Sequence, residues 1–178
     1  MTIFFARSFS TMRLHAPGFA ACVIIVLLSF VGADAQQDDP DAPPPPTVVS
    51  KEDKLKLEAK TNVKDRTKLA LEMMDMHISA AERFGTDQNY ARAYGEFGVF
   101  HGLLEHLVNF LERSDRGESK NLDEFKRLDI TLRRFGPRIE SVRRDMPTEY
   151  DEYMRTLLQR VRDVRSRAVD HFFDHSNG

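Results

Sequence analysis

The sequence predicts an all-α fold, an antiparallel four-helix bundle with a kinked third helix, preceded by a signal peptide and a Pro-rich linker. Three observations support this prediction. Along four segments after residue 50, apolar residues recur at spacings of three and four, the repeat of one helical face. None of these segments shows the alternation of apolar and polar residues that is typical of a β-strand. Short breaks at 85–87 and 147–148 favour adjacent antiparallel helices.

Residues 1–35 have the organisation of a secretory signal peptide. Arg7 and Arg13 precede the apolar run GFAACVIIVLLSFVG, and the small residues ADA close it at Ala35. The run has about 15 residues, whereas a membrane-spanning helix needs roughly 20. We therefore expect cleavage after Ala35, with an uncleaved anchor as the alternative. Cleavage removes Cys22, the single cysteine, so the mature chain must be held by its own core.

Residues 36–49, QQDDPDAPPPPTVV, predict a disordered Pro-rich linker. Four consecutive prolines favour polyproline II, an extended conformation without internal hydrogen bonds. The alternative is a tether that holds the domain away from a membrane or a partner. The helical-bundle domain is expected to occupy residues 50–176.

The first helix is expected to run from Ser50 to Phe84. Ser50 can cap it, and Glu52 and Asp53 in its first turn favour the positive end of the helix dipole. Gly85 supplies the stop. Its apolar stripe consists of Val63, Thr67, Ala70, Met74, His77, Ala81 and Phe84. Met73, Met74 and Met76 lie close to His77 in the sequence, and we expect His77 to pack in the core rather than to bind copper with them.

The second helix is expected from Thr86 or Asp87 to about Leu111 or Glu112. Its broad apolar face consists of Tyr90, Ala93, Phe97, Phe100, Leu104, Leu107, Val108 and Leu111. A nearly opposite narrow stripe consists of Ala91, Gly95, Gly98 and Gly102. A helix that is apolar on most of its circumference is central. Each glycine weakens a helix by roughly 0.5–1 kcal/mol relative to alanine, so the stripe predicts close approach of a neighbouring backbone or bulky side chain. A ligand groove and a partner surface are the alternatives.

The third helix is expected to begin after Asn121, with Glu124 completing a capping-box-like pair. Its stripe consists of Phe125, Leu128, Leu132, Phe135, Ile139, Val142 and Met146. The stripe continues through Gly136 and Pro137, and proline inside a helix removes a hydrogen bond and bends the chain. Because the register survives, we expect one kinked helix.

The fourth helix is expected to begin at Thr148. Its seam consists of Tyr150, Met154, Leu157, Val161, Val164, Ala168, His171 and His175. Off this seam lie five arginines, Arg155, Arg160, Arg162, Arg165 and Arg167, interleaved with acidic residues. A solvated face with ion pairs along the helix is expected. An acidic partner or a phosphate surface is the alternative.

The histidines His171 and His175 lie four residues apart on one helical face, a spacing at which two imidazoles can share a metal ion. Two ligands are too few for a typical zinc site. At about 1.5 Å of rise per residue, His106 is the one histidine that an antiparallel bundle brings to a similar depth. We expect no metal site and no cofactor.

The sequence also indicates that the chain is not an enzyme. Glu96 and Glu105 lie about 180° apart on the second helix and cannot form an acid–base pair. The sequence contains no phosphate loop, no Cys–His pair and no G-x-S-x-G motif, so no catalytic residue is assigned. A net charge of −2 gives no strong attraction to nucleic acid or anionic lipid.

The expected function is therefore that of an exported helical-bundle protein with a structural or protein-binding role. Its expected location is the bacterial envelope, periplasmic or secreted, with a protein partner there and no stable membrane span after processing. The alternative is a periplasmic ligand- or metal-binding bundle that uses His106, His171 and His175.

Overall fold

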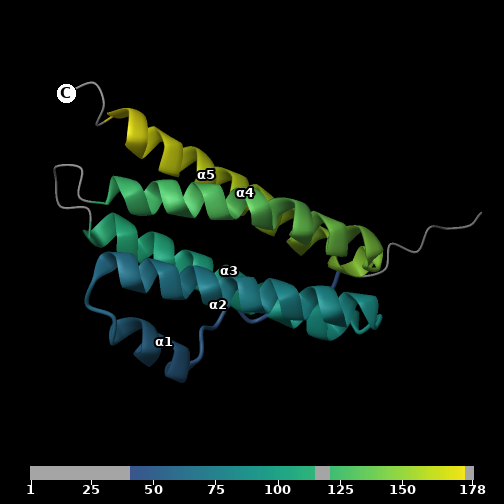
Figure 1. Cartoon of the computed structure of the whole chain (residues 1–178). Helices are drawn as coiled ribbons and strands as arrows, with labels where there is room; N and C mark the ends of the chain where they lie inside the picture. The colour runs from purple at the N-terminus through teal and green to yellow at the C-terminus, as the bar shows by residue number, and fades with distance from the viewer. Residues whose placement is uncertain (1–40, 115–120, 175–178) are drawn as a thin grey trace, which may run out of the picture. The chain divides into compact units, whose positions relative to one another are not determined.

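The computed structural model describes residues 41–114 and 121–174, with backbone alone for residues 171–174. The described helices are α1 (Lys51–Glu58), α2 (Val63–Thr86), α3 (Tyr90–Ser114), α4 (Leu122–Asp145), the short 3₁₀ helix η1 (Thr148–Tyr150) and α5 (Asp151–Asp174). Helices α2 and α3 form one packed pair, α4 and α5 form another, and α2 also packs on α4 (Figure 1). The predicted all-α fold of antiparallel helices is confirmed. The predicted signal peptide lies outside the described residues.

The single helix predicted for residues 50–84 is wrong, because the chain leaves the helix between Glu58 and Val63. Asn62 caps α2, and its side-chain oxygen accepts hydrogen bonds from the backbone N–H groups of Lys64 and Asp65. Asparagine bonds locally to the backbone in this way and so favours helix ends over helix interiors. The predicted cap at Ser50 is present, since its hydroxyl oxygen accepts from the backbone of Asp53 at 3.0 Å.

Helix α3 is buried on most of its circumference, as expected of a central helix. Its buried residues are Ala93, Tyr94, Phe97, Gly98, Phe100, Gly102, Leu103, Leu104, Leu107, Val108 and Leu111. Phe100 meets Phe135 of α4 edge to face, with ring centroids 5.9 Å apart, a favoured aromatic geometry. The core of the bundle therefore lies around α3.

Helix α4 continues through Gly136 and Pro137 without a break, so the prediction of one helix is confirmed. All seven residues of its predicted stripe are buried. The expected capping box is not formed within the described residues, because the Asn121 side chain makes no cap hydrogen bond there. Directly after the proline, Arg138 donates to both carboxylate oxygens of Glu82, at 2.7 and 2.6 Å, and to Asp75 at 2.5 Å. This clamp joins α4 to α2 on the side away from α5.

An extended segment, residues 42–49, lies against α3, and we call it the strap. A Cβ atom at Gly98 would lie 2.7 Å from the carbonyl oxygen of Pro46, and one at Gly102 would lie 2.5 Å from that of Thr47. The strap thus uses two glycines of the predicted small-residue stripe. At Gly95, a Cβ would have no heavy atom of the described chain within 4 Å.

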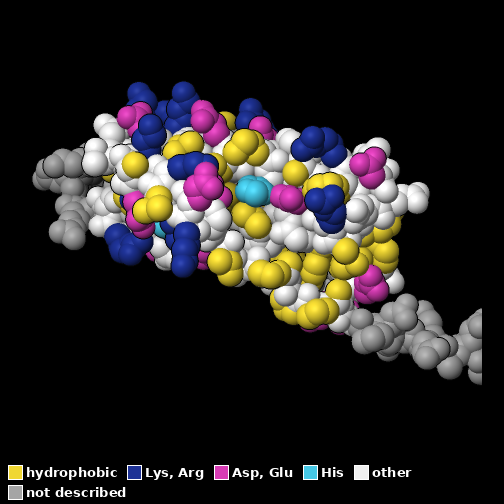
Figure 2. Space-filling model, turned by 90° about the horizontal axis from the view of Figure 1, so that it is seen from below, with side chains coloured by type: hydrophobic (Ala, Val, Ile, Leu, Met, Phe, Trp, Pro, Cys, Tyr) yellow, Lys and Arg dark blue, Asp and Glu magenta, His cyan; other side chains and the backbone are white. Residues whose placement is uncertain are grey.

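The strap differs from the disordered linker expected for residues 36–49. Pro45 and Val49 are buried, and the backbone N–H of Ala42 donates to the carbonyl oxygen of Glu149 at 2.7 Å. Polyproline II leaves no internal hydrogen bonds to break, so a close-fitting cleft is enough to order it. Its outer side remains apolar, with Val48 66% exposed, and hydrophobic side chains gather in Figure 2 where the described chain begins.

Candidate functional site

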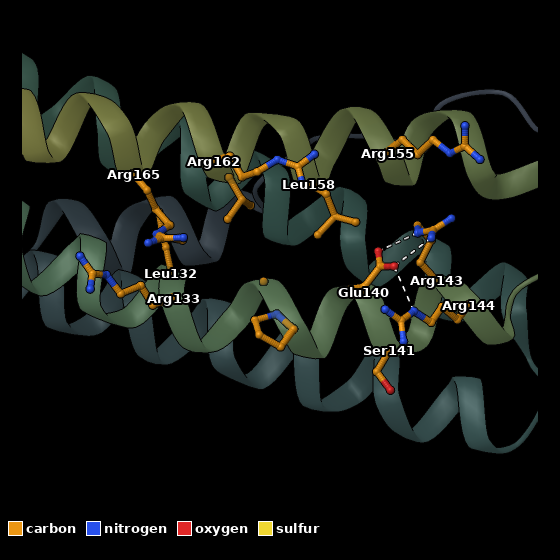
Figure 3. A pocket seen from close by; sticks show the side chains of 13 residues that line it. Leu132, Arg133, Glu140, Ser141, Arg143, Arg144, Arg155, Leu158, Arg162 and Arg165 are labelled. Carbon is orange, nitrogen blue, oxygen red and sulfur yellow. Dashed lines mark hydrogen bonds and ion pairs between the residues drawn. The ribbon is translucent and has the colours of Figure 1, made fainter.

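A groove of about 870 Å³ lies between α4 and α5. Its floor is apolar and consists of Leu132, Pro137, Leu158 and Val161. Pro137 is exposed, whereas the other three residues are buried in the core. Six arginines line its two sides: Arg133, Arg143, Arg144, Arg155, Arg162 and Arg165. Figure 3 shows them arranged along both helices, with Leu158 pointing into the space between. We call this feature the arginine groove.

The helical repeat of each sequence explains why these arginines share one surface. On α4 the buried stripe faces α2 and α3, and the groove residues Arg133, Gly136, Glu140 and Arg144 follow at three- and four-residue spacing on another face. On α5, Arg155, Leu158, Arg162 and Arg165 repeat in the same way.

A missing side chain deepens the groove near its middle. A Cβ at Gly136 would have no heavy atom of the described chain within 4 Å, so this position of α4 opens onto free space. Gly136 therefore differs from Gly98 and Gly102, where the strap occupies the space that a Cβ atom would need.

Carboxylates bridge the arginines in pairs. Asp129 lies 2.8 Å from Arg133 and 3.1 Å from Arg165, at one end of the groove. At the other end, Glu140 lies 2.8 Å from Arg143 and 3.1 Å from Arg144.

A third carboxylate, Asp151, lies 2.6 Å from Arg155 and also pairs with Arg143. Hydrogen bonds from Arg143 and Arg144 hold the pKa of Glu140 at about 2, so this group is ionised at any physiological pH. Six guanidinium groups therefore meet three bridging carboxylates, which leaves three positive charges in excess around the groove.

Two of the arginines have bonding capacity to spare. Arg162 contacts the amide oxygen of Gln159 at 3.1 and 3.3 Å, and in the described part of the chain it pairs with no carboxylate. The side chain of Arg155 is 71% exposed and engages one oxygen of Asp151. A guanidinium carries five N–H donors, so both residues can receive further carboxylate oxygens.

The sequence identified half of this surface. Of the five arginines singled out on the last helix, Arg155, Arg162 and Arg165 line the groove. Arg160 instead binds Glu105 of α3 at 2.5 and 2.7 Å, and Arg167 lies 3.5 Å from Glu112. The arginines of α4 were not predicted, although their spacing places them together on the face beside the buried stripe.

The structure separates the remaining predicted candidates. His106 Nε2 accepts a hydrogen bond from the guanidinium of Arg66 of α2 at 3.0 Å, and this guanidinium lies 4.1 Å above the Phe110 ring. The side chains of His171 and His175 lie outside the described residues. Among the residues with described side chains, no three potential ligands come together as a metal site would require. The metal-binding alternative stays a prediction.

The expectation that His77 packs in the apolar core is wrong. It is partly exposed, and its Nδ1 lies 2.6 Å from the carboxylate of Glu96 across α2 and α3. Glu105 pairs with Arg160, so Glu96 and Glu105 make separate contacts.

Two other histidines are partly buried at helix contacts. His101 Nδ1 lies 3.0 Å from the Tyr153 hydroxyl, where burial lowers the pKa of the imidazole. Burial and then the charge of Arg66 lower the pKa of His106. Both imidazoles favour the neutral form in the folded state.

We expect the free energy of unfolding to fall as the pH decreases through about 6.5 toward 5. The unfolded chain binds protons on His101 and His106 near pH 6.5, whereas the folded chain binds them at lower pH, so the histidines stabilise the fold above that range. Asp41 raises the pKa of Glu152, so this carboxyl group makes the free energy of unfolding rise as the pH falls. The measurement therefore uses a Glu152→Gln background, which removes this opposing effect.

The measurement is urea unfolding at several pH values between about 5 and 7.5. Replacing both histidines with glutamine should flatten the dependence. An equally steep dependence in that variant would contradict the assignment.

The described helices include none that combines the length and apolar character of a membrane span. No protein-family model, curated protein or solved structure matches the chain.

Proposed function

We propose that this chain is an exported four-helix bundle, α2 to α5 with α1 and the strap added, that binds an acidic protein segment in the arginine groove. The observation that carries the proposal is the excess of arginine over carboxylate along an apolar floor. The role is binding rather than catalysis because arginine stays protonated and does not exchange protons in the physiological range.

Two properties of the groove favour an acidic protein segment over a small anion. The volume of about 870 Å³ is far larger than one phosphate group needs. The exposed Pro137 and the aliphatic stems of the arginines add contact area that a phosphate cannot use, whereas the side chains of a protein segment can bury it. Carboxylate groups match the arginines bidentately along the sides.

The location of the protein is part of the proposal. The charged, apolar and small-residue order of residues 1–35 supports export and cleavage after Ala35, into the periplasm or the medium. We expect mature protein from an exporting bacterium to begin at Gln36, as N-terminal sequencing and intact mass would show. Mature protein that retains Cys22 would contradict this part of the proposal.

We expect Arg155→Glu/Arg162→Glu to weaken the binding of a short labelled peptide of leucine and glutamate by about tenfold or more, equal to about 1.4 kcal/mol. The two changes remove attractive charges and introduce repulsive ones at the groove sites with free donors. Fluorescence anisotropy at several salt concentrations is the measurement, since an electrostatic contact weakens as salt rises.

The matched control is Lys51→Glu/Arg83→Glu, which makes the same change in net charge at two exposed positions outside the groove. Circular dichroism verifies that both variants fold. Equal weakening in the two variants would show a general charge effect and would overturn the groove as the site.

A further inference from the structure

We infer that the segment bound by the arginine groove is an amphipathic α-helix with acidic residues at both ends of its contact face. This inference rests on the proposed function and names the shape and side-chain pattern of the partner. Its basis is the arrangement of charge, apolar surface and backbone along the groove.

The length of the groove suits a short helix. Arg133 and Arg144 are separated along α4 by about 16 Å, and Arg155 and Arg165 along α5 by about 15 Å, at 1.5 Å per residue. A helix of this length presents about three turns, whereas an extended peptide presents about five residues. The two sides come from antiparallel helices, the surface that helix-in-groove recognition uses.

The backbone hydrogen bonds of the groove also favour a helical partner. Both sides of the groove belong to α4 and α5, whose central backbone groups are bonded within each helix, apart from the Arg133 carbonyl that Pro137 cannot pair. The groove therefore offers side chains but no free strand edge. An extended peptide in the groove would leave most of its own N–H groups without partners, because arginine donates hydrogen bonds and accepts none, whereas a helix pairs these groups internally.

The charge pattern sets the expected sequence of the partner. Arg133 and Arg165 meet at Asp129 at one end, and Arg143 and Arg155 meet at Asp151 at the other. Between the ends lies the apolar floor with Leu158 and, on its side, Arg162 (Figure 3). A helix with acidic residues about three turns apart and apolar residues between them matches both the arginines at the two ends and the floor between them.

Gly136 provides room for the partner's backbone or a bulky side chain near the centre. Its Cβ position opens onto free space in the described structure. The same chain shows what such an opening permits, because the glycines of α3 let the carbonyl groups of the strap approach to contact distance.

The test uses the mature full chain and three probes. The first is a side-chain-stapled helical peptide with leucines at i, i+3, i+4 and i+7 and glutamates at the ends of that face. The second is a scrambled, unstapled peptide of the same composition and charge. The third is inorganic tripolyphosphate. Isothermal titration calorimetry gives each dissociation constant.

We expect the helical peptide to bind at least about tenfold more tightly than the scrambled one. Gly136→Leu should weaken the helical peptide by a similar factor, since its side chain fills the centre of the groove. The matched control is Gly95→Leu, which also places a leucine in open space on a helix, but on α3 away from the groove. It should bind as the unaltered protein does.

The outcomes separate the two proposals. Equal affinity for both peptides, lost in Arg155→Glu/Arg162→Glu, would overturn the helical partner and leave the acidic segment standing. Failure of both peptides to bind would overturn both. Tighter binding of tripolyphosphate, with displacement of the peptide, would also overturn both in favour of a phosphate site.

Discussion

Replacing Gly102 with leucine is expected to expel the strap from α3 and to lower the free energy of unfolding by about 1–3 kcal/mol. Even the first atom of the new side chain would lie 2.5 Å from the carbonyl oxygen of Thr47, a backbone atom that cannot rotate away. Gly98→Leu should act in the same way, because its Cβ would lie 2.7 Å from the oxygen of Pro46. The loss includes the buried contacts of Pro45 and Val49.

An alanine series separates this overlap from the ordinary cost of glycine in a helix. Gly95→Ala should stabilise the protein by about 0.5–1 kcal/mol, since its Cβ meets no atom of the described chain within 4 Å. Gly98→Ala and Gly102→Ala should instead destabilise it, because overlap with the strap outweighs the gain in helix propensity.

Thermal unfolding followed by circular dichroism measures the series, at about 3–5 °C per kcal/mol for a domain of this size. Limited proteolysis reports release of the strap directly, through new cleavage among residues 42–49. A leucine variant with an unchanged midpoint and an uncut strap would contradict the packing described for α3.

Replacing Leu57 with alanine is expected to cost about 2–4 kcal/mol and to detach α1 from the bundle. Leu57 is fully buried, and it is the one buried residue of this eight-residue helix. An isolated helix so short is unstable in water, so α1 should unfold once its anchor is lost. Hydrogen exchange of the α1 amides is the measurement, together with urea unfolding.

Leu55→Ala is the matched control for this change. Leu55 belongs to the same helix and is 67% exposed, so the same truncation removes little buried surface. It should change the free energy of unfolding by no more than about 0.5 kcal/mol. Similar losses in the two variants would mean that helix propensity, not the burial of Leu57, holds α1.

The fold was predictable where one short-range pattern determined it. The stripe of α4 from Phe125 to Met146 is buried as expected. Its unbroken register correctly predicted that the helix continues through Pro137. The same reasoning placed α3 at the centre. These features depend on the period of an α-helix and on residues close in sequence, which is the information a single chain displays most directly.

The features that were missed, apart from the break at Asn62, depend on partners far apart in the chain. The fit of Pro46 and Thr47 to the glycines of α3 requires contacts between segments about fifty residues apart, and composition alone indicates disorder for such a segment. The break at Asn62 follows a local capping bond that competes with continued helix. The arginine groove combines residues from two helices, so the pattern on either one alone resembles a solvated face.

The strap also constrains the order of events during synthesis and the proposed export. Its residues leave the ribosome before α3 exists, so the segment must remain unpaired until at least Gly102 has followed it. The predicted processing site after Ala35 lies six residues before Asp41, the first described residue, a reach of about 20 Å of extended chain. Cleavage that precedes folding meets a free substrate, whereas cleavage after folding must act close to a closed surface. Under the proposed cleavage after Ala35, we expect a fast-folding variant of this bundle to be processed more slowly than the natural chain, so that the rate of folding would set the rate of maturation.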